Sequence, residues 1–309
     1  GAGQTLIGAL AGDAITTGAD NTAVGYQALT TNQTSANNTA VGVSALKLNT
    51  GANNTAVGRG ALLNQAAGSD NVAVGKDAGN DITSGVKNVL VGTLTGDALT
   101  DADRNVAVGD QALSTDTLGS RSTAIGFGAL NVQNFTTATD SYNTAVGYGA
   151  GIALTTGTSN NLVGGLAGDA LTTGSFNQVL GTAALGADTL GSRSVAIGHA
   201  ALLAQNFTTA TDVYNIAIGH NAGLSVTTGI QNTLIGGLAG DALTDADYNT
   251  GLGYLALTAD TLGSNSVAVG AFALRDQNLT TATDTFNVAV GYNAGGDVTT
   301  GVQNTIVGG

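Results

Sequence analysis

The sequence lacks Pro, Cys, Met, Trp and Glu entirely, and only 4% of its 309 residues are aromatic. The absence of Cys excludes disulfides and thiolate metal sites, and it leaves the redox compartment open. Without Glu, and with Gly, Thr and Asn abundant, long helices and coiled coils are not expected. Stability must therefore come from the stacking of strands and turns.

Positive charge is also scarce, with 8 Lys and Arg against 21 acidic side chains, all of them Asp, and a net charge of −13. Since nucleic-acid affinity rests on clustered cations, we expect no nucleic-acid partner. No run of about 18 apolar residues occurs, so no membrane span is expected. The first four residues have neither the charged nor the apolar region of a signal peptide, so an export signal would lie outside this segment.

A pentapeptide, Asn-x-(Ala/Leu)-(Val/Ile)-Gly, recurs in eighteen copies whose closing glycines run from Gly8 to Gly308, mostly 17 residues apart. A unit this short cannot bury a hydrophobic face alone, so each must be one coil stacked on its neighbours. The repeated Val, Ile and Thr with turn formers between them are typical of strands and turns. The sequence predicts an all-β parallel solenoid, or β-roll, of about 18 coils. We expect one continuous domain over 1–309, with regular coils in 1–112 and a longer super-repeat in 113–309.

Two neighbouring positions in the pentapeptide are apolar. The residue before the closing glycine is Val, Ile or Leu in all eighteen copies, and the residue before that is usually Ala, as in Ala23. Successive side chains of a strand point to opposite faces, so one row fills the coil and the other needs a cover. A 17-residue coil has too little chain to supply it. The sequence therefore predicts a partner chain against this row, with Ala allowing close approach.

The rest of each coil predicts a second strand and a second turn. Ala stands three residues after the closing glycine in sixteen of seventeen coils, for example at Ala28 and Ala45. Many coils also have Gly seven residues before the closing glycine, as at Gly18 and Gly51, where positive φ is expected. Two short strands and two turns make a flattened β-roll.

The first pentapeptide position is Asn in fourteen copies, Ser in three and Gln in one. Stacked coils place these side chains about 4.8 Å apart, where amides can form hydrogen bonds along a ladder. A structural ladder is the expected role, and a ligand role is the alternative. The Asn ladder comprises Asn21, Asn38, Asn54, Asn71, Asn88, Asn105, Asn143, Asn160, Asn177, Asn215, Asn232, Asn249, Asn287 and Asn304.

The runs Asn21-Thr-Ala-Val-Gly25 and Ser194-Val-Ala-Ile-Gly198 resemble the head repeats of trimeric autotransporter adhesins of the Yersinia adhesin type. Similar repeats occur in bacteriophage tail fibres. The resemblance covers all eighteen coils and implies a left-handed parallel β-roll, a homotrimer formed through the inner strands, and attachment to host surfaces. The repeat here is somewhat longer than in those heads. The neck, stalk and membrane anchor of the adhesins, and the self-cleaving chaperone of some tail fibres, are not seen in this segment.

Three coils are 21 residues long and end at Gly147, Gly219 and Gly291, which are 72 residues apart. Their extra residues are nearly identical and are expected to bulge on one side. Aromatic side chains on regularly spaced loops suit contact with another surface. Packing back onto the roll or a neighbouring protomer is the alternative. The contact candidates are Phe135, Tyr142, Phe207, Tyr214, Leu279 and Phe286.

The two histidines, His199 and His220, each follow a closing glycine and are expected to stack on adjacent coils, where a trimer would gather six of them. Because the same position elsewhere holds unrelated residues, an exposed variable site without metal is expected. The pairs Asp101/Asp103 and Asp245/Asp247 resemble the start of a calcium loop. They lack the glycine and distal Glu of an EF-hand, so solvated turn aspartates are expected and calcium is the alternative.

No catalytic constellation is evident. Asp97, Asp169 and Asp241 recur four coils apart, roughly 19 Å, which is too far for a carboxylate pair. No Ser/His/Asp set is present, so we expect neither an enzyme nor a cofactor.

The preferred function is a structural and adhesive fibre segment, extracellular on a cell surface, filament or virion, giving stiffness and multivalent surface contact. The expected partners are further copies of the chain, in a trimer and end to end, and a glycan or protein of a host or neighbouring surface. A self-assembling extracellular filament is the alternative, since neither end carries a polar cap. Ice binding is a weaker alternative that rests on interrupted Thr pairs, such as those beginning at Thr16, Thr172 and Thr227.

Overall fold

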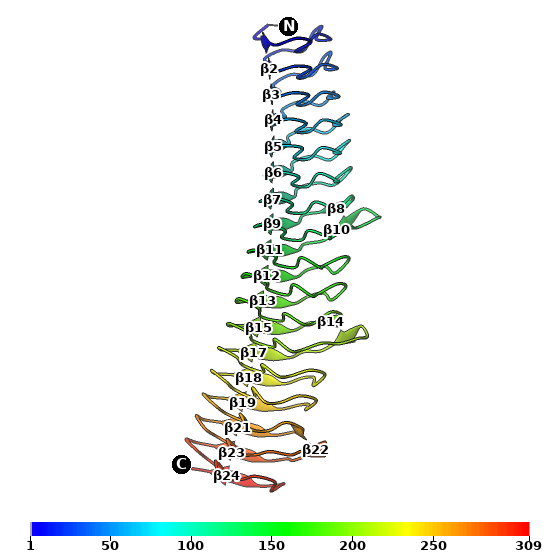
Figure 1. Ribbon diagram of the computed structural model, residues 1–309. Coiled ribbons are helices and arrows are strands. Elements are labelled where there is room, and N and C mark those ends of the chain that lie inside the picture. The colour runs from blue at the N-terminus through cyan, green and yellow to red at the C-terminus, as the bar shows by residue number, and fades with distance from the viewer. Residues whose placement is uncertain (1, 309) are drawn as a thin grey trace. The chain divides into compact units, whose positions relative to one another are not determined.

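The computed structural model describes residues 2–308, which form strands and turns and contain no helix (Figure 1). The chain divides into two compact units, Gly1–Thr156 and Gly157–Gly309. In each unit every coil contributes one three-residue strand, which is the middle of the pentapeptide. This confirms the predicted all-β parallel solenoid of about 18 coils with a period near 17 residues.

The first unit has nine main strands that pair in chain order. They are β1 (Thr5–Ile7), β2 (Thr22–Val24), β3 (Thr39–Val41), β4 (Thr55–Val57), β5 (Val72–Val74), β6 (Val89–Val91), β7 (Val106–Val108), β9 (Thr123–Ile125) and β11 (Thr144–Val146). Each pairing is parallel and sets a repeat position beside the same position of the next coil, for example Ala23 beside Ala40.

The second unit follows the same plan with nine main strands. They are β12 (Asn161–Val163), β13 (Gln178–Leu180), β15 (Val195–Ile197), β17 (Ile216–Ile218), β18 (Thr233–Ile235), β19 (Thr250–Leu252), β21 (Val267–Val269), β23 (Val288–Val290) and β24 (Thr305–Val307).

The strand alternation decides which apolar row lies inside. Ala23, Ala40 and the equivalent residues are fully buried within their coils. The Val, Ile or Leu before the closing glycine points outward, and Val57 and Leu252 are exposed. This corrects the expectation that Ala would allow close approach of a partner, because the outward row carries the larger side chains.

The predicted second strand at Ala28 and Ala45 is a turn. The residues on either side of Ala28 have positive φ, 56° at Gln27 and 55° at Leu29, which no pleated strand allows. Their backbone N–H groups still join coils, since Gln27 donates to the carbonyl of Ala9 and Leu29 to that of Ala45. The chain therefore turns here while its backbone hydrogen bonds stay paired with neighbouring coils. Ala28 and Leu29 are fully buried and belong to the core.

Closing and second-turn glycines are required for different reasons. Gly25 has φ 136°, and a Cβ there would lie 2.5 Å from the carbonyl oxygen of Gly42 in the next coil. Gly18 was predicted to need positive φ, but it does not adopt it. A Cβ on Gly18 would lie 2.5 Å from the carbonyl oxygen of Ser35, so close approach of the next coil is what requires glycine there.

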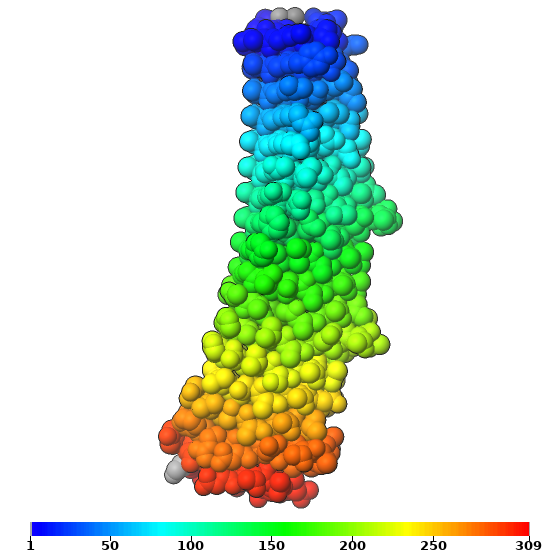
Figure 2. Space-filling view, viewed as in Figure 1, coloured from blue at the N-terminus to red at the C-terminus, as the bar shows by residue number. Residues whose placement is uncertain are grey.

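The three 21-residue coils add short paired strands away from the main ladder. In the first unit β8 (Gly119–Ser120) pairs with β10 (Thr139–Asp140). In the second unit β14 (Gly191–Ser192) pairs with β16 (Thr211–Asp212), and β20 (Gly263–Ser264) pairs with β22 (Thr283–Asp284). Figure 2 shows the β10 and β16 regions as knobs on the surface, in green and yellow-green, so these insertions bulge as predicted.

Candidate binding surface

The six predicted contact residues of the insertions separate into two groups. Phe135, Phe207 and Leu279 are only 6% exposed, because each lies at the start of its insertion and packs into the coil. They are core residues, which agrees with the alternative that they pack back onto the roll rather than contact another surface. Tyr142, Tyr214 and Phe286 stand at the other end of the insertions with about half of their surface exposed (53%, 50% and 54%).

An arginine accompanies two of the exposed rings. The guanidinium of Arg121 lies over the Tyr142 ring, 5.6 Å from its centroid, and is paired with Asp140 at 2.8 Å. Hydrogen bonding to Asp140 raises the pKa of Arg121 above its ordinary value. In the second unit Arg193 repeats this arrangement with Tyr214 and Asp212. The first two insertions thus present a ring and an internally neutralised ion pair, whereas in the third the amide of Asn265 donates to Asp284 at 2.9 Å.

A buried polar network supports each insertion from beneath. In the first unit Asp116 is fully buried and accepts hydrogen bonds from the backbone N–H groups of Gly119 and Phe135, both at 3.0 Å, and from Nε2 of Gln133 at 2.6 Å. Gln133 Nε2 also donates to Ser122 Oγ at 2.8 Å. The carboxylate thereby fixes the first residue of the insertion to the coil below.

The second unit contains this network twice. Asp188 accepts from Gly191 N (3.0 Å), Phe207 N (3.2 Å) and Gln205 Nε2 (2.6 Å), and Gln205 donates to Ser194 Oγ at 3.0 Å. Gln205 Oε1 in turn accepts from Asn215 Nδ2 at 3.0 Å. The second copy uses the corresponding residues Asp260, Gln277, Ser266 and Asn287.

Sequence reasoning missed these carboxylates, although the signal was present. Seven residues after the closing glycine, eight of the seventeen coils carry Ile, Leu or Val, such as Ile82 and Leu171. At the same position each insertion coil carries Gln and the coil before it carries Asp, one 17-residue period earlier. The three Ser residues at the first pentapeptide position coincide with the same sites. Ser leaves room for the Gln amide and accepts its hydrogen bond, which explains why Asn is replaced there.

Several carboxyls have raised pKa values because they are buried. Desolvation raises the pKa of Asp116 and Asp188 despite the hydrogen bonds they accept. Desolvation also raises the pKa of Asp97 to about 6, with the nearby charges of Asp81 and Asp77 adding to the effect. Oδ1 of Asp97 is buried without a hydrogen-bond partner, which agrees with this direction.

The stability of the protein is expected to fall as pH rises from about 4 to about 6. The pKa of Asp97 is 3.8 in the unfolded chain and about 6 in the folded protein, so between these pH values the folded state binds more protons than the unfolded state. The stability that comes from this bound proton is lost as pH rises to about 6. Asp116 and Asp188 act in the same direction, whereas the lowered pKa of exposed Asp276 opposes them weakly. Urea unfolding at several pH values measures the slope, and Asp97→Asn should reduce it. A slope that is flat or rises over this window would contradict the assignment.

Thirteen of the fourteen Asn side chains are buried, Asn304 is half-buried, and the row joins successive coils through the backbone. Oδ1 of Asn21 accepts from the backbone N–H of Asn38 at 2.9 Å, and Nδ2 of Asn21 donates to the carbonyl of Ser35 at 2.9 Å. Direct amide-to-amide bonds are secondary, as between Asn88 and Asn71 at 3.1 Å. With both ends of the amide satisfied inside the coil, a ligand has no access to this row.

The two histidines lie on adjacent coils as predicted. The rings of His199 and His220 are stacked, with centroids 5.2 Å apart and planes inclined by 11°, and both are exposed. Between residues 2 and 308 no group of three or more His, Asp, Cys or Glu side chains is arranged to hold a metal ion.

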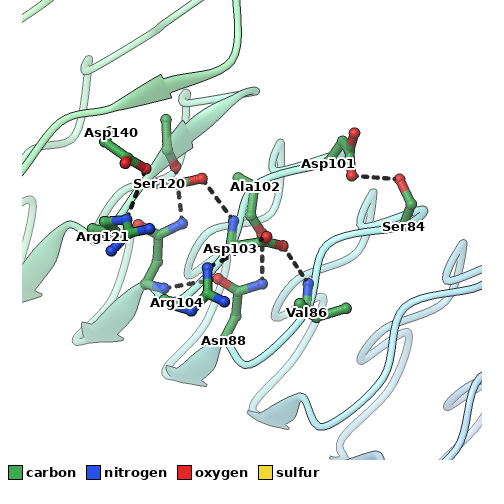
Figure 3. A network of polar contacts seen from close by, with 12 residues as sticks. Ser84, Val86, Asn88, Asp101, Ala102, Asp103, Arg104, Ser120, Arg121 and Asp140 are labelled. Carbon is green, nitrogen blue, oxygen red and sulfur yellow. Dashed lines mark hydrogen bonds and ion pairs between the residues drawn. The ribbon is translucent and has the colours of Figure 1, made fainter.

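The aspartates of the calcium-like runs take part in bonds between coils (Figure 3). Asp101 accepts from Ser84 Oγ at 2.7 Å, and Asp103 accepts from the backbone N–H of Val86 at 2.8 Å. In the second unit Asp245 accepts from Thr228 Oγ1 at 2.6 Å, and Asp247 accepts from a backbone N–H in the same way. Their carboxylates therefore already stabilise the turns.

The outward face of the main strands is a regular apolar surface in each unit. In the first unit its exposed members include Val57, Val74 and Ile125, and in the second unit they include Leu180 and Leu252. Soluble monomers rarely expose long contiguous apolar patches, so such a face indicates an interaction surface. The described residues contain no helix of the length and apolar character that a membrane crossing needs.

Comparison with protein-family models and with curated proteins gave no match. The functional interpretation therefore rests on the two surfaces described above, the apolar strand face and the exposed residues of the insertions.

Proposed function

We propose that this chain is a segment of a structural and adhesive extracellular fibre, assembled from copies of itself and holding another surface through many repeated contacts. The apolar face of the main strands carries this proposal. Within each unit it recurs at the same position in coil after coil, so a second copy can meet it at many coils rather than at one site. The resemblance to trimeric adhesin heads favours a left-handed homotrimer.

The adhesive part of the proposal is supported by the insertions. Their exposed rings recur at fixed intervals, so modest contacts would add through effective concentration. A self-assembling filament uses the same strand face and remains the second candidate. Ice binding is less favoured because the first hydroxyls of the pairs at Thr16, Thr172 and Thr227 donate to carbonyls of the next coil.

The self-assembly is tested by placing charge on the strand face. The double variant Leu252→Asp, Val290→Asp is expected to convert a trimer into a monomer with an unchanged far-ultraviolet circular dichroism spectrum, since both side chains point out of the coil. Sedimentation equilibrium measures the mass. Thr208→Asp, on an exposed insertion, adds charge elsewhere and should leave the trimer intact. A folded monomer from the unchanged protein would exclude the proposal.

A further inference from the structure

One side chain per coil forms a column along eight coils of the second unit, at the position before the Asn or Ser that opens each pentapeptide, and all of its members except the half-buried Asn265 are exposed. Backbone N–H groups of this column bond to the preceding coil, as from Phe176 to Thr158 at 3.0 Å and from Tyr248 to Ile230 at 3.1 Å. Rings and polar side chains alternate over eight consecutive coils. We call this the aromatic column, and it comprises Phe176, Arg193, Tyr214, Gln231, Tyr248, Asn265, Phe286 and Gln303.

The rings occupy backbone positions that do not suit them. Phe176, Tyr214, Tyr248 and Phe286 have φ of 62°, 56°, 59° and 50°, in the left-handed region where bulky residues are strained. In the first unit the same position begins with Asp20, Asn37, Asn53 and Asp70, the types that tolerate this conformation best. Each ring of the column is about half exposed, so it contributes little to the core. Strained and exposed aromatic side chains indicate a binding role.

The beginning of the column is connected through Arg193, which is the one charged side chain of the column. Arg193 lies between two rings, with its guanidinium carbon 5.0 Å from the centroid of Phe176 and 5.8 Å from that of Tyr214. Its charge is paired with Asp212 at 2.8 Å. Successive rings are two coils apart, about 9.6 Å at the strand spacing. A ligand that follows the column would therefore meet a ring at regular intervals and a polar side chain between them.

From this geometry we infer that the aromatic column binds a neutral, linear polysaccharide laid along the coils, an inference that rests on the proposed adhesive function. A sugar ring offers apolar C–H groups to an aromatic ring and hydroxyl groups to the amides of Gln231 and Gln303. An extended polysaccharide repeats over a distance similar to the ring spacing. The net charge of −13 and the paired Arg193 disfavour polyanions. Proline-rich peptides are held in aromatic-lined grooves, whereas these rings stand in single file.

The test is affinity electrophoresis of the whole protein in gels containing a soluble neutral β-glucan, with carboxymethylcellulose as the anionic comparison. Retardation is expected in the neutral gel and not in the anionic one. The double variant Tyr248→Asn, Phe286→Asn should weaken binding by at least about tenfold. Its thermal midpoint should stay the same or rise, because Asn accepts positive φ more readily than an aromatic residue. Loss of binding without loss of stability separates a contact role from a structural one.

Tyr292→Asn is the matched control, since Tyr292 is an exposed ring outside the column, and it should bind like the unchanged protein. Equal binding by the double variant and the control would overturn the inference, as would binding to a polyproline peptide but not to the glucan. Adhesion of the protein to a protein-coated surface is measured in parallel. If that adhesion persists while no glucan binds, the inference fails and the adhesive function stands.

Discussion

Replacing Gly236 with Ala is expected to lower the free energy of unfolding of the second unit by about 3 kcal/mol, whereas the same change at the next residue, Gly237, should alter it by less than about 0.5 kcal/mol. Gly236 has φ 138°, and a Cβ there would lie 2.4 Å from the carbonyl oxygen of Gly253 in the next coil. The backbone fixes the position of a Cβ, and the carbonyl oxygen belongs to the backbone, so no rotamer change relieves the contact. At Gly237 the nearest atom is Tyr254 Cδ2 at 3.5 Å, an ordinary contact.

Both variants replace a glycine with alanine, at adjacent positions, so Gly237→Ala is the control for the added methyl group in Gly236→Ala. Urea unfolding followed by circular dichroism gives the free-energy difference. Because coils contact only their neighbours, amide hydrogen exchange should show the loss of protection concentrated in β18 and β19. Equal stabilities of the two variants would mean that the closing glycine is not required by coil spacing.

The solenoid was predictable because one short period controls both the chain path and the strand positions. The pentapeptide fixed the location of every main strand, and the stacking of His199 on His220 followed from their equal place in successive repeats. The same repetition did not show which apolar row lies inside. Alternating side chains place the Ala row and the Val, Ile or Leu row on opposite faces of the strand, but the pattern does not tell which face is the inner one. Nor did it show that the Ala28 position is a turn. That conformation depends on positive φ at Leu29, a residue that gives no such signal in sequence.

The insertions were located from sequence but their contacts were not. Phe135 looked like an exposed aromatic residue because it stands in an added segment, yet its backbone is held by the buried Asp116 and its ring lies in the coil. A buried carboxylate is recognised only when its donors are known, and those donors come from two different coils. The sequence thus indicated where the chain departs from its period and left the direction of each side chain undecided.

Replacing Asp188 with Ala is expected to lower the free energy of unfolding by about 3 kcal/mol, because it leaves three buried donors without an acceptor. These donors are the backbone N–H groups of Gly191 and Phe207 and one N–H of the Gln205 amide, whose other N–H stays bonded to Ser194 Oγ. The loss should become smaller as pH rises, because burial raises the pKa of Asp188 and the unchanged protein loses the stability of the extra bound proton at higher pH. Asp212→Ala, which removes an exposed carboxylate from the same insertion, should change stability little.

Exchanging the carboxylate of Asp188 and the amide of Gln205 tests the hydrogen bond between these two side chains while one buried carboxylate is kept in the network. Asp188→Asn alone keeps an oxygen for the two backbone donors but turns an NH₂ group toward the NH₂ group of Gln205, so it should destabilise the fold. Adding Gln205→Glu restores a donor and an acceptor across that contact. The new carboxylate can still accept from Asn215, and the Ser194 hydroxyl, which accepts from Gln205 in the unchanged protein, can rotate to donate to it. The double variant should therefore recover at least about 1 kcal/mol relative to Asp188→Asn. Additive losses in this cycle would show that Asp188 and Gln205 do not act through the bond between them.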